Sequence, residues 1–156
     1  MTGRMVRIAL DAMGGDNAPT AIVAGGLQAL AADGEIELIL VGRDDVVRPL
    51  LGGRMDRVSV VHASEVVEMD EHPASAVRTK KDSSINVGAH LVADGKADAF
   101  VSAGNSGGVL AAAIFLVKRL PGLERPAIGT AIPTRTGSAL LIDSGANTEV
   151  KPEYLY

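Results

Sequence analysis

The chain has 156 residues, a formal net charge of −4, 47% hydrophobic and 22% charged residues, values typical of a single globular domain. Aromatic residues make up 3% of the chain and tryptophan is absent, so the composition favours neither a basic nor a base-stacking surface for nucleic acid. The absence of cysteine excludes disulfides, cysteine-bound metals and a cysteine nucleophile.

Apolar runs alternate with helical patterns along the first two-thirds of the chain. Short runs rich in Val, Ile and Leu predict strands at residues 6–10, 36–41, 58–61 and 99–101. Apolar spacings of three and four residues predict helices at 20–33, 44–51, 85–94 and 106–120, with a short helix after Pro73. Asp44 and either Ser83 or Ser84 are suited to cap two of these helices. The last helix is apolar nearly all round, which predicts burial on two sides.

Two more predicted strands, 128–132 and 138–142, flank a polar stretch and favour an antiparallel hairpin. Repeated strand–helix–strand units favour a mostly parallel sheet with helices on both faces. The predicted fold class is therefore α/β, a three-layer α/β/α sandwich with a Rossmann-like sheet and an appended hairpin. The apolar run 109–117 is too short to span a bilayer, and no secretory signal is visible, so we expect a cytoplasmic protein.

A glycine-rich loop, residues 11–19 (DAMGGDNAP), follows the first predicted strand. Gly14 and Gly15 allow a tight turn that other residues resist, and Asp11 and Asp16 flank them. Open α/β folds bind ligands at the carboxyl ends of their strands, so we expect the loops that follow residues 10, 101 and 142 to lie on one side of the sheet. The loop therefore predicts ligand contacts from these four residues.

A second glycine-rich loop, residues 102–108 (SAGNSGG), joins the predicted strand at 99–101 to a helix. Free N–H groups at a helix N-terminus, wrapped by glycines, form an anion site, which predicts phosphate contacts from Gly104, Ser106 and Gly107. Asn105 is the candidate donor to phosphate or a developing oxyanion, and the alternative is that Asn105 or Ser106 caps the helix. The loop is neither a P-loop nor a dinucleotide-binding motif, since both patterns are absent.

The densest cationic cluster, residues 78–84 (RTKKDSS), precedes the predicted helix at 85–94. Arg78, Lys80 and Lys81, with Ser83 and Ser84, are suited to hold a phosphate or a phosphopantetheine. The alternative is a solvated basic loop. The pattern does not separate Lys80 from Lys81: one is expected to face the site and the other water.

Other polar residues at predicted strand ends remain open to two interpretations. Asp143, Gly145 and Asn147 follow the last predicted strand and suit either ligand contacts or loop and cap hydrogen bonds. The three histidines match no metal spacing, and we predict neither a metal nor a cofactor. His72, which precedes Pro73 in an acidic stretch, is the one histidine kept as a functional candidate.

Four ordered motifs carry a resemblance to a known family. They are residues 8–19 (IALDAMGGDNAP), 78–84, 102–107, and 143–147 (DSGAN) with 151–153 (KPE). In order and spacing they resemble the bacterial phosphate acyltransferases, across the whole chain. Two positions depart from that pattern: Ser106 stands where the family commonly has Thr, and Ser144 where it commonly has an apolar residue. Family members are considerably longer, so the resemblance implies an N-terminal part of one acyltransferase domain.

The resemblance implies transfer of a fatty acyl group from acyl carrier protein to inorganic phosphate, giving acyl-phosphate for phospholipid synthesis. It also implies an isocitrate/isopropylmalate dehydrogenase-like fold, a homodimer, and peripheral membrane association through the part that is missing here. Lys81 and Asn105 are then the catalytic candidates. Alternatives are a phosphate acetyl- or butyryltransferase-like enzyme that uses coenzyme A thioesters, or an inactive ligand-binding fragment.

Overall fold

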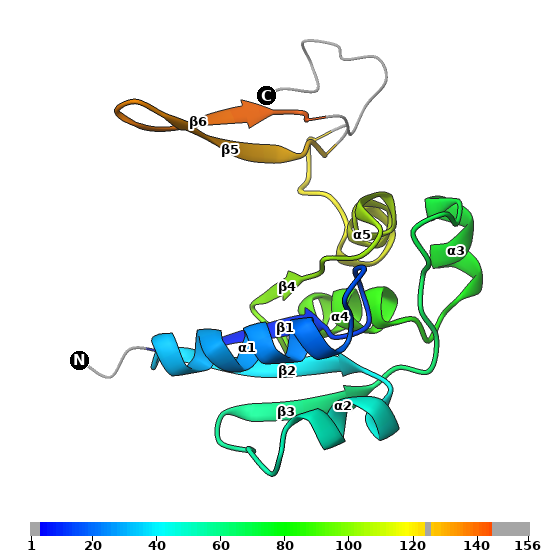
Figure 1. Ribbon diagram of the computed structural model, residues 1–156. Helices are drawn as coiled ribbons and strands as arrows, with labels where there is room; N and C mark the ends of the chain where they lie inside the picture. Colours follow the sequence, from blue (N-terminus) through cyan, green and yellow to red (C-terminus); the bar gives the residue numbers. More distant parts are fainter. Residues whose placement is uncertain (1–3, 124–125, 145–156) are drawn as a thin grey trace. The chain divides into compact units, whose positions relative to one another are not determined.

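A four-stranded parallel sheet organises the first part of the chain in the computed structural model, which describes residues 4–123 and 126–144. The sheet order is β3-β2-β1-β4 (Figure 1). Its strands are β1 (Val6–Asp11), β2 (Ile36–Gly42), β3 (Val58–His62) and β4 (Ala99–Val101). Leu10 pairs with both Leu40 and Val101, so the carboxyl ends of β1, β2 and β4 lie at one edge.

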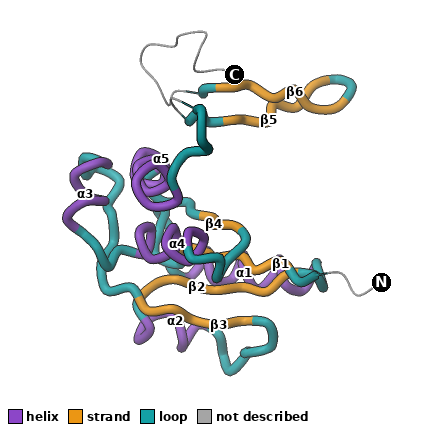
Figure 2. Tube along the Cα trace, turned by 180° about the vertical axis from the view of Figure 1, so that it is seen from behind, coloured by secondary structure: helices purple, strands orange, loops and turns teal. Residues whose placement is uncertain are grey.

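Helices pack on both faces of this sheet. The helices of this part of the chain are α1 (Thr20–Ala32), α2 (Asp44–Leu50), α3 (Pro73–Thr79), α4 (Ser84–Ala93) and α5 (Ser106–Ala112), with a π-helical turn η1 (Ala113–Val117) after α5. Of these, α1 and α2 pack on one face of the sheet and α4 on the other. Because side chains alternate along a strand, Leu38 and Leu40 enter the core with α1 and α2, while Ile39 and Val41 enter the core with α4. Viewed from behind, α4 covers the face opposite α1 (Figure 2).

A further apolar core lies away from the sheet, where α3, α4 and α5 meet. Its buried members include Val77 of α3, Ile85 of α4 and Ala111 of α5, together with Val67 of the segment that precedes α3. Phe100 of β4 packs against this core and also against the core between α4 and the sheet. This arrangement fixes α3 and α5 beside the carboxyl edge of the sheet.

The structure confirms the predicted strands and the short helix after Pro73, but two helix predictions are wrong. The helix expected over 106–120 is α-helical only to Ala112, and Lys118 then takes a left-handed conformation with φ 73°, which ends helical geometry. Phe115 and Val117 remain 40% and 41% exposed, so burial on two sides does not extend to this turn. Asp44 does not cap α2: it is the first helical residue, and its N–H donates to His62 Nδ1 at 3.3 Å.

A separate antiparallel hairpin belongs to the second of two compact units, Met1–Val117 and Lys118–Tyr156. It consists of β5 (Gly129–Thr134) and β6 (Gly137–Ile142). Register pairs place Ala131 opposite Leu140 and Thr130 opposite Leu141, so both faces of the hairpin carry apolar side chains. Leu140 and Leu141 are exposed.

A cluster of ion pairs connects the start of β1 to the turn before β4. The Arg7 guanidinium donates to both carboxylate oxygens of Asp98, at 3.1 Å each, and the Arg7 amide donates to Oδ2 at 2.9 Å. Arg4 adds a further contact to Oδ1 at 2.5 Å. These bonds lower the pKa of Asp98 to about 2, and the side-chain bonds from Arg7 have the largest effect. The carboxylate is therefore stabilised in its charged form by folding.

We expect this cluster to make the stability difference between the wild type and Asp98→Asn depend on pH. A lowered pKa adds stability above the unfolded value of about 3.9, and that stability is lost as the pH falls through the folded value. The wild type should therefore be the more stable at neutral pH, and the difference should shrink from about pH 5 downward toward pH 2. Urea unfolding at a series of pH values measures it, with Asp70→Asn as a control. A difference that stays constant down to pH 2 would contradict the assignment.

Candidate functional site

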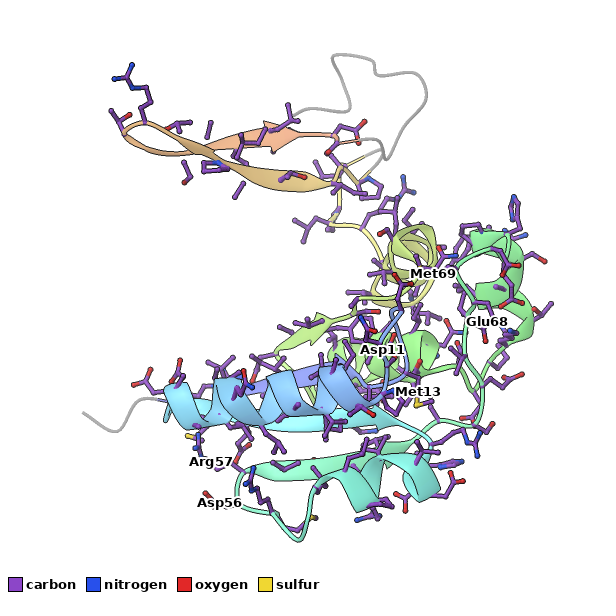
Figure 3. The ribbon with its side chains drawn as sticks, in the orientation of Figure 1. Asp11, Met13, Asp56, Arg57, Glu68 and Met69 are labelled. Atoms are coloured by element: carbon purple, nitrogen blue, oxygen red, sulfur yellow. The ribbon has the colours of Figure 1, made fainter. Side chains whose placement is uncertain are left out.

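The carboxyl ends of β1 and β4 are joined by a buried carboxylate. Asp11, which is 1% exposed, accepts a hydrogen bond from Ser102 Oγ at 2.7 Å and one from the Met13 amide at 3.0 Å. The Gly104 amide donates to the same Ser102 oxygen at 3.0 Å. Figure 3 labels Asp11 and Met13 at the end of β1. Asp11 therefore positions the two glycine-rich loops, and Ser102 is the partner that the sequence did not identify.

The glycines of the two loops lie against each other. A Cβ on Gly14 would stand 2.4 Å from Asp11 Oδ2 and 2.9 Å from the Gly104 amide, distances that no side chain tolerates. Gly15 has a φ of +103° and also faces the other loop, at Ala103. The glycines predicted for phosphate binding thus first serve to let the loops meet, while Asp16 beside them is exposed.

Asn105 is the residue that connects the second loop to the rest of the carboxyl edge. Its Oδ1 accepts the Gly108 amide at 2.9 Å, which caps α5. Its Nδ2 lies 3.0 Å from the Glu68 carbonyl, 3.4 Å from that of Met69 and 3.3 Å from that of Glu71. Asn105 is 6% exposed and both ends of its amide are engaged. The alternative of a helix cap is confirmed, and the catalytic role stays a prediction.

The neighbouring positions of this loop differ in what they present to solvent. Ser106 is exposed at the start of α5. Gly107 lies against α3, because a Cβ there would stand 2.6 Å from Pro73 Cγ. His72 is the exposed N-cap residue of α3, without a side-chain cap bond. Of these predicted residues, Ser106 and His72 therefore keep exposed side chains.

The structure separates the two lysines that the sequence pattern left equivalent. Lys80 Nζ donates to Glu71 Oε2 at 2.5 Å and to the Val66 carbonyl at 2.7 Å. Lys81 is exposed, and its side chain makes no hydrogen bond or ion pair with any residue in the described part of the chain. Arg78 is exposed too, with its guanidinium 5.0 Å from the Phe115 ring centroid. Lys81 is therefore the lysine of the pair with its charge open to a ligand.

Ser83 and Ser84 are fully buried at the start of α4. Ser83 Oγ accepts the Asn86 amide at 3.4 Å and caps the helix. Ser84 Oγ and Asn86 Oδ1 have no hydrogen-bond partner among the described residues. Neither serine side chain reaches the surface in this structure, so a phosphate contact from either one remains a prediction.

Three predicted contacts lie in the second unit or beyond the described residues. Asp143 follows β6 with a φ of 62°. Gly145 and Asn147 lie outside the described residues. Of the glycine loops expected to share one edge, those after β1 and β4 meet, and the loop after β6 belongs to the other unit.

Two residues that the sequence did not single out complete the carboxyl edge. Asp82 accepts the Ser64 amide at 2.9 Å and the Ser64 hydroxyl at 2.5 Å, and these bonds lower the pKa of Asp82. Glu71 binds Lys80, and that bond, with the Glu68 amide, lowers the pKa of Glu71. No periodic pattern links Glu71 to a lysine nine positions later, so only the fold reveals the pair.

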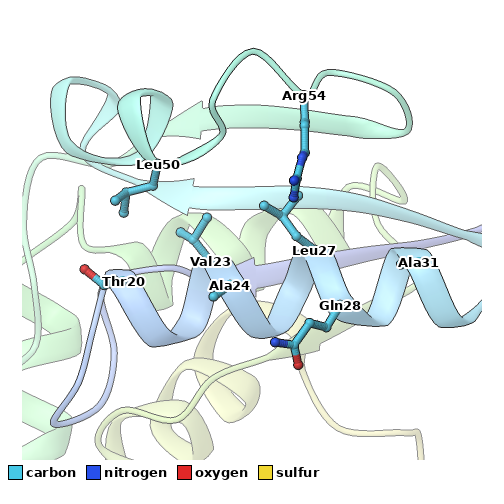
Figure 4. Close-up of a pocket in the computed structure, with 8 residues that line it drawn as sticks. All are labelled: Thr20, Val23, Ala24, Leu27, Gln28, Ala31, Leu50 and Arg54. Carbon is cyan, nitrogen blue, oxygen red and sulfur yellow. The ribbon is translucent and has the colours of Figure 1, made fainter.

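Two hollows of the first unit lie beside α1. One, of about 390 Å³, lies between α1 and α2 and is lined by Val23, Leu27, Leu50 and Arg54 among others (Figure 4). An apolar groove of about 370 Å³ runs between α1 and the open edge at β4, with Ser102 at its end. Within the described ranges, no three His, Asp or Glu side chains form a metal-binding group. The helices described there are also too short or too polar to cross a membrane.

Comparison with known proteins confirms the resemblance carried by the motifs. The model of the family described as "Fatty acid synthesis protein" matches residues 6–156. Similar curated proteins include the phosphate acyltransferases of Desulfitobacterium hafniense strain Y51, 52% identical over 153 residues, and of Myxococcus xanthus, 51% identical over 154 residues. These alignments cover 97% and 96% of this chain but 45% and 44% of the relatives, so the chain spans less than half of their length. The chain belongs to the fatty acid synthesis protein family and is a homologue of the phosphate acyltransferases.

Proposed function

We propose that the protein containing this chain transfers a fatty acyl group from acyl carrier protein to inorganic phosphate, giving acyl-phosphate for phospholipid synthesis. The observation that carries this proposal is about 50% identity over nearly the whole chain to proteins named phosphate acyltransferase. The four motifs that suggested the activity fall within the matched residues. Transfer to phosphate also explains why the chain gathers cations and a helix start at one edge of the sheet.

The proposed reaction needs no enzymic nucleophile. A phosphate oxygen attacks the thioester carbonyl, a carbon–oxygen bond forms, the carbon–sulfur bond breaks, and the carrier's thiolate leaves. The protein must hold phosphate beside the thioester and stabilise the tetrahedral oxyanion. Lys81, with its free charge, is the proposed phosphate ligand, with Arg78, Asp16, Ser106 and the other loop residues around it. Asn105 is proposed to donate to phosphate or the oxyanion, which requires its bonds to the 68–71 carbonyls to open.

Several finer features are proposed on the same basis. The parallel sheet with helices on both faces supports a three-layer α/β/α sandwich of the isocitrate/isopropylmalate dehydrogenase-like kind. The exposed apolar faces of the β5–β6 hairpin support association into a homodimer, since two strands alone form a poor core. A cytoplasmic protein with peripheral membrane contact through segments beyond this chain completes the proposal.

Product analysis tests the function. The complete protein is incubated with phosphate and either acyl-acyl carrier protein or the matching coenzyme A thioester, and acyl-phosphate is measured. Faster formation from the carrier-bound donor supports the proposal. Preference for coenzyme A supports an acetyl- or butyryltransferase-like enzyme. A radiolabelled acyl group trapped on the protein without phosphate would overturn direct attack and point to a hydroxyl such as that of Ser102 or Ser106.

The two lysines are expected to respond differently to substitution in the complete protein. Lys81→Ala should raise the KM for phosphate about 10- to 100-fold, because a hydrogen bond to a charged group is worth about 1.5–3 kcal/mol. Lys80→Ala should raise it less, since phosphate gains Lys80 only by displacing Glu71. Steady-state kinetics at saturating acyl donor measure both. Wild-type values for both variants would exclude the cluster from the phosphate site.

A further inference from the structure

Residues 65–72 cross the carboxyl edge between β3 and α3, and Glu71 is the most tightly held side chain among their acids. The Glu71 carboxylate accepts Lys80 Nζ at 2.5 Å and the Glu68 amide at 2.8 Å through the same oxygen. The side chains of Lys80 and Glu71 are 26% and 31% exposed, so a small anion from solvent can reach the pair. An ammonium group and a backbone amide converging on one oxygen form the donor set that binds phosphate in proteins.

The same segment is held from the other side by Asn105. Asn105 Nδ2 lies within hydrogen-bond distance of three carbonyls, those of Glu68, Met69 and Glu71. Glu71 is thus bound at its side chain by the cationic cluster and at its backbone by the second glycine-rich loop. A ligand that displaces the Glu71 side chain therefore acts on a residue whose carbonyl lies within hydrogen-bond distance of Asn105, the N-cap residue of α5.

We propose that Glu71 is an internal competitor for phosphate: its carboxylate occupies Lys80 in the ligand-free protein, and phosphate binds there by displacing it. The proposal rests on the proposed function, because it assumes that the 78–84 cluster receives phosphate. The lowered pKa of Glu71, caused first by its bond to Lys80, agrees with a carboxylate held in its charged form. Glu71 then weakens phosphate binding by the free energy of the ion pair that phosphate must break.

Glu71→Gln tests the proposal because it removes the charge and keeps the shape. Calorimetric titration of the complete protein with inorganic phosphate, at fixed ionic strength, should give a dissociation constant about two- to fivefold lower than the wild type, the range for a partly exposed ion pair. Glu68→Gln is the matched control, since it is the same substitution on the same segment, and the Glu68 side chain bonds to no described residue. Its dissociation constant should equal that of the wild type.

A second pair of variants separates a local contact from a general charge effect. In a Lys80→Gln background, Glu71→Gln should leave the phosphate affinity unchanged, because the competed group is gone. Glu71→Asp withdraws the carboxylate by one methylene and should tighten binding like Glu71→Gln, which keeps the test available if the glutamine variant does not fold. Equal or weaker phosphate binding in both Glu71 variants overturns the proposal, as does an equal gain in Glu68→Gln or undetectable binding in every variant.

The outcome is distinguishable from failure of the proposed function. If Glu71→Gln tightens phosphate binding and the wild type forms no acyl-phosphate, the competitor role stands and the acyltransferase function fails. If the wild type forms acyl-phosphate and Glu71→Gln has the same KM for phosphate as the wild type, the function stands and the competitor role fails.

Discussion

Replacing Gly88 by alanine is expected to lower the free energy of unfolding by about 1–3 kcal/mol, the usual cost of inserting a methyl group into a well-packed core. Gly88 is buried in α4, where the helix lies against the sheet. A Cβ there would stand 2.2 Å from Cε2 and 2.5 Å from Cδ2 of Phe100. The Phe100 ring packs in two cores at once, so it cannot move aside without disturbing one of them.

Gly25→Ala is the matched control, because it makes the same substitution within a helix. Gly25 is exposed on α1, and a Cβ there meets no described atom within 4 Å. Alanine should raise the free energy of unfolding by about 0.5–1 kcal/mol, since glycine is the poorer helix former. Urea unfolding measures both variants. A rise in the free energy of unfolding in both variants would show that helix propensity, rather than the contact with Phe100, decides the effect at Gly88.

The parts of the fold that follow from local patterns were predictable from the sequence. Residues 38–41 of β2 form a continuous apolar run because both faces of the strand are covered, and glycines follow the C-terminal end of α2, with φ values of +56° and +83° at Gly52 and Gly53. The early end of α5 was not predictable, because the apolar residues 113–117 continue the helical pattern while the backbone widens into a π-helical turn. Nothing in the spacing distinguishes these two geometries.

The candidate site, like the fold, was predictable from the sequence only in part. The loops after β1 and β4 were expected to meet, since parallel strands place their carboxyl ends at one edge, and the bond between Asp11 and Ser102 confirms it. The partners within that edge were not predictable. Whether Lys80 or Lys81 is free depends on Glu71, which reaches the cluster only through the path of residues 65–72. A bond between distant side chains leaves no periodic trace in a sequence.

Substitution of Asn105 is expected to have the largest effect on activity. In the complete protein, Asn105→Ala should lower kcat about 10²–10³-fold, the usual loss when a donor to an oxyanion is removed. The KM for the acyl donor should change less, because Asn105 is proposed to act on the phosphate or the oxyanion. Steady-state kinetics with both substrates varied separate the two constants. A wild-type kcat would remove Asn105 from the catalytic groups.

Asn105→Asp separates the two structural roles of the amide. Aspartate caps a helix about as well as asparagine, so the bond from the Gly108 amide should survive. The carboxylate has no N–H to give to the carbonyls of Glu68, Met69 and Glu71, and it places a charge beside them. Amide hydrogen exchange should therefore become faster at residues 66–72, while α5 and the β1–β2 pair keep wild-type protection. Faster exchange along α5 as well would mean that the cap, and not the bonds to the segment, is the feature that Asn105 supplies. A variant that keeps the cap but loses kcat would place the effect on the donated N–H, because the acceptor oxygen is still present.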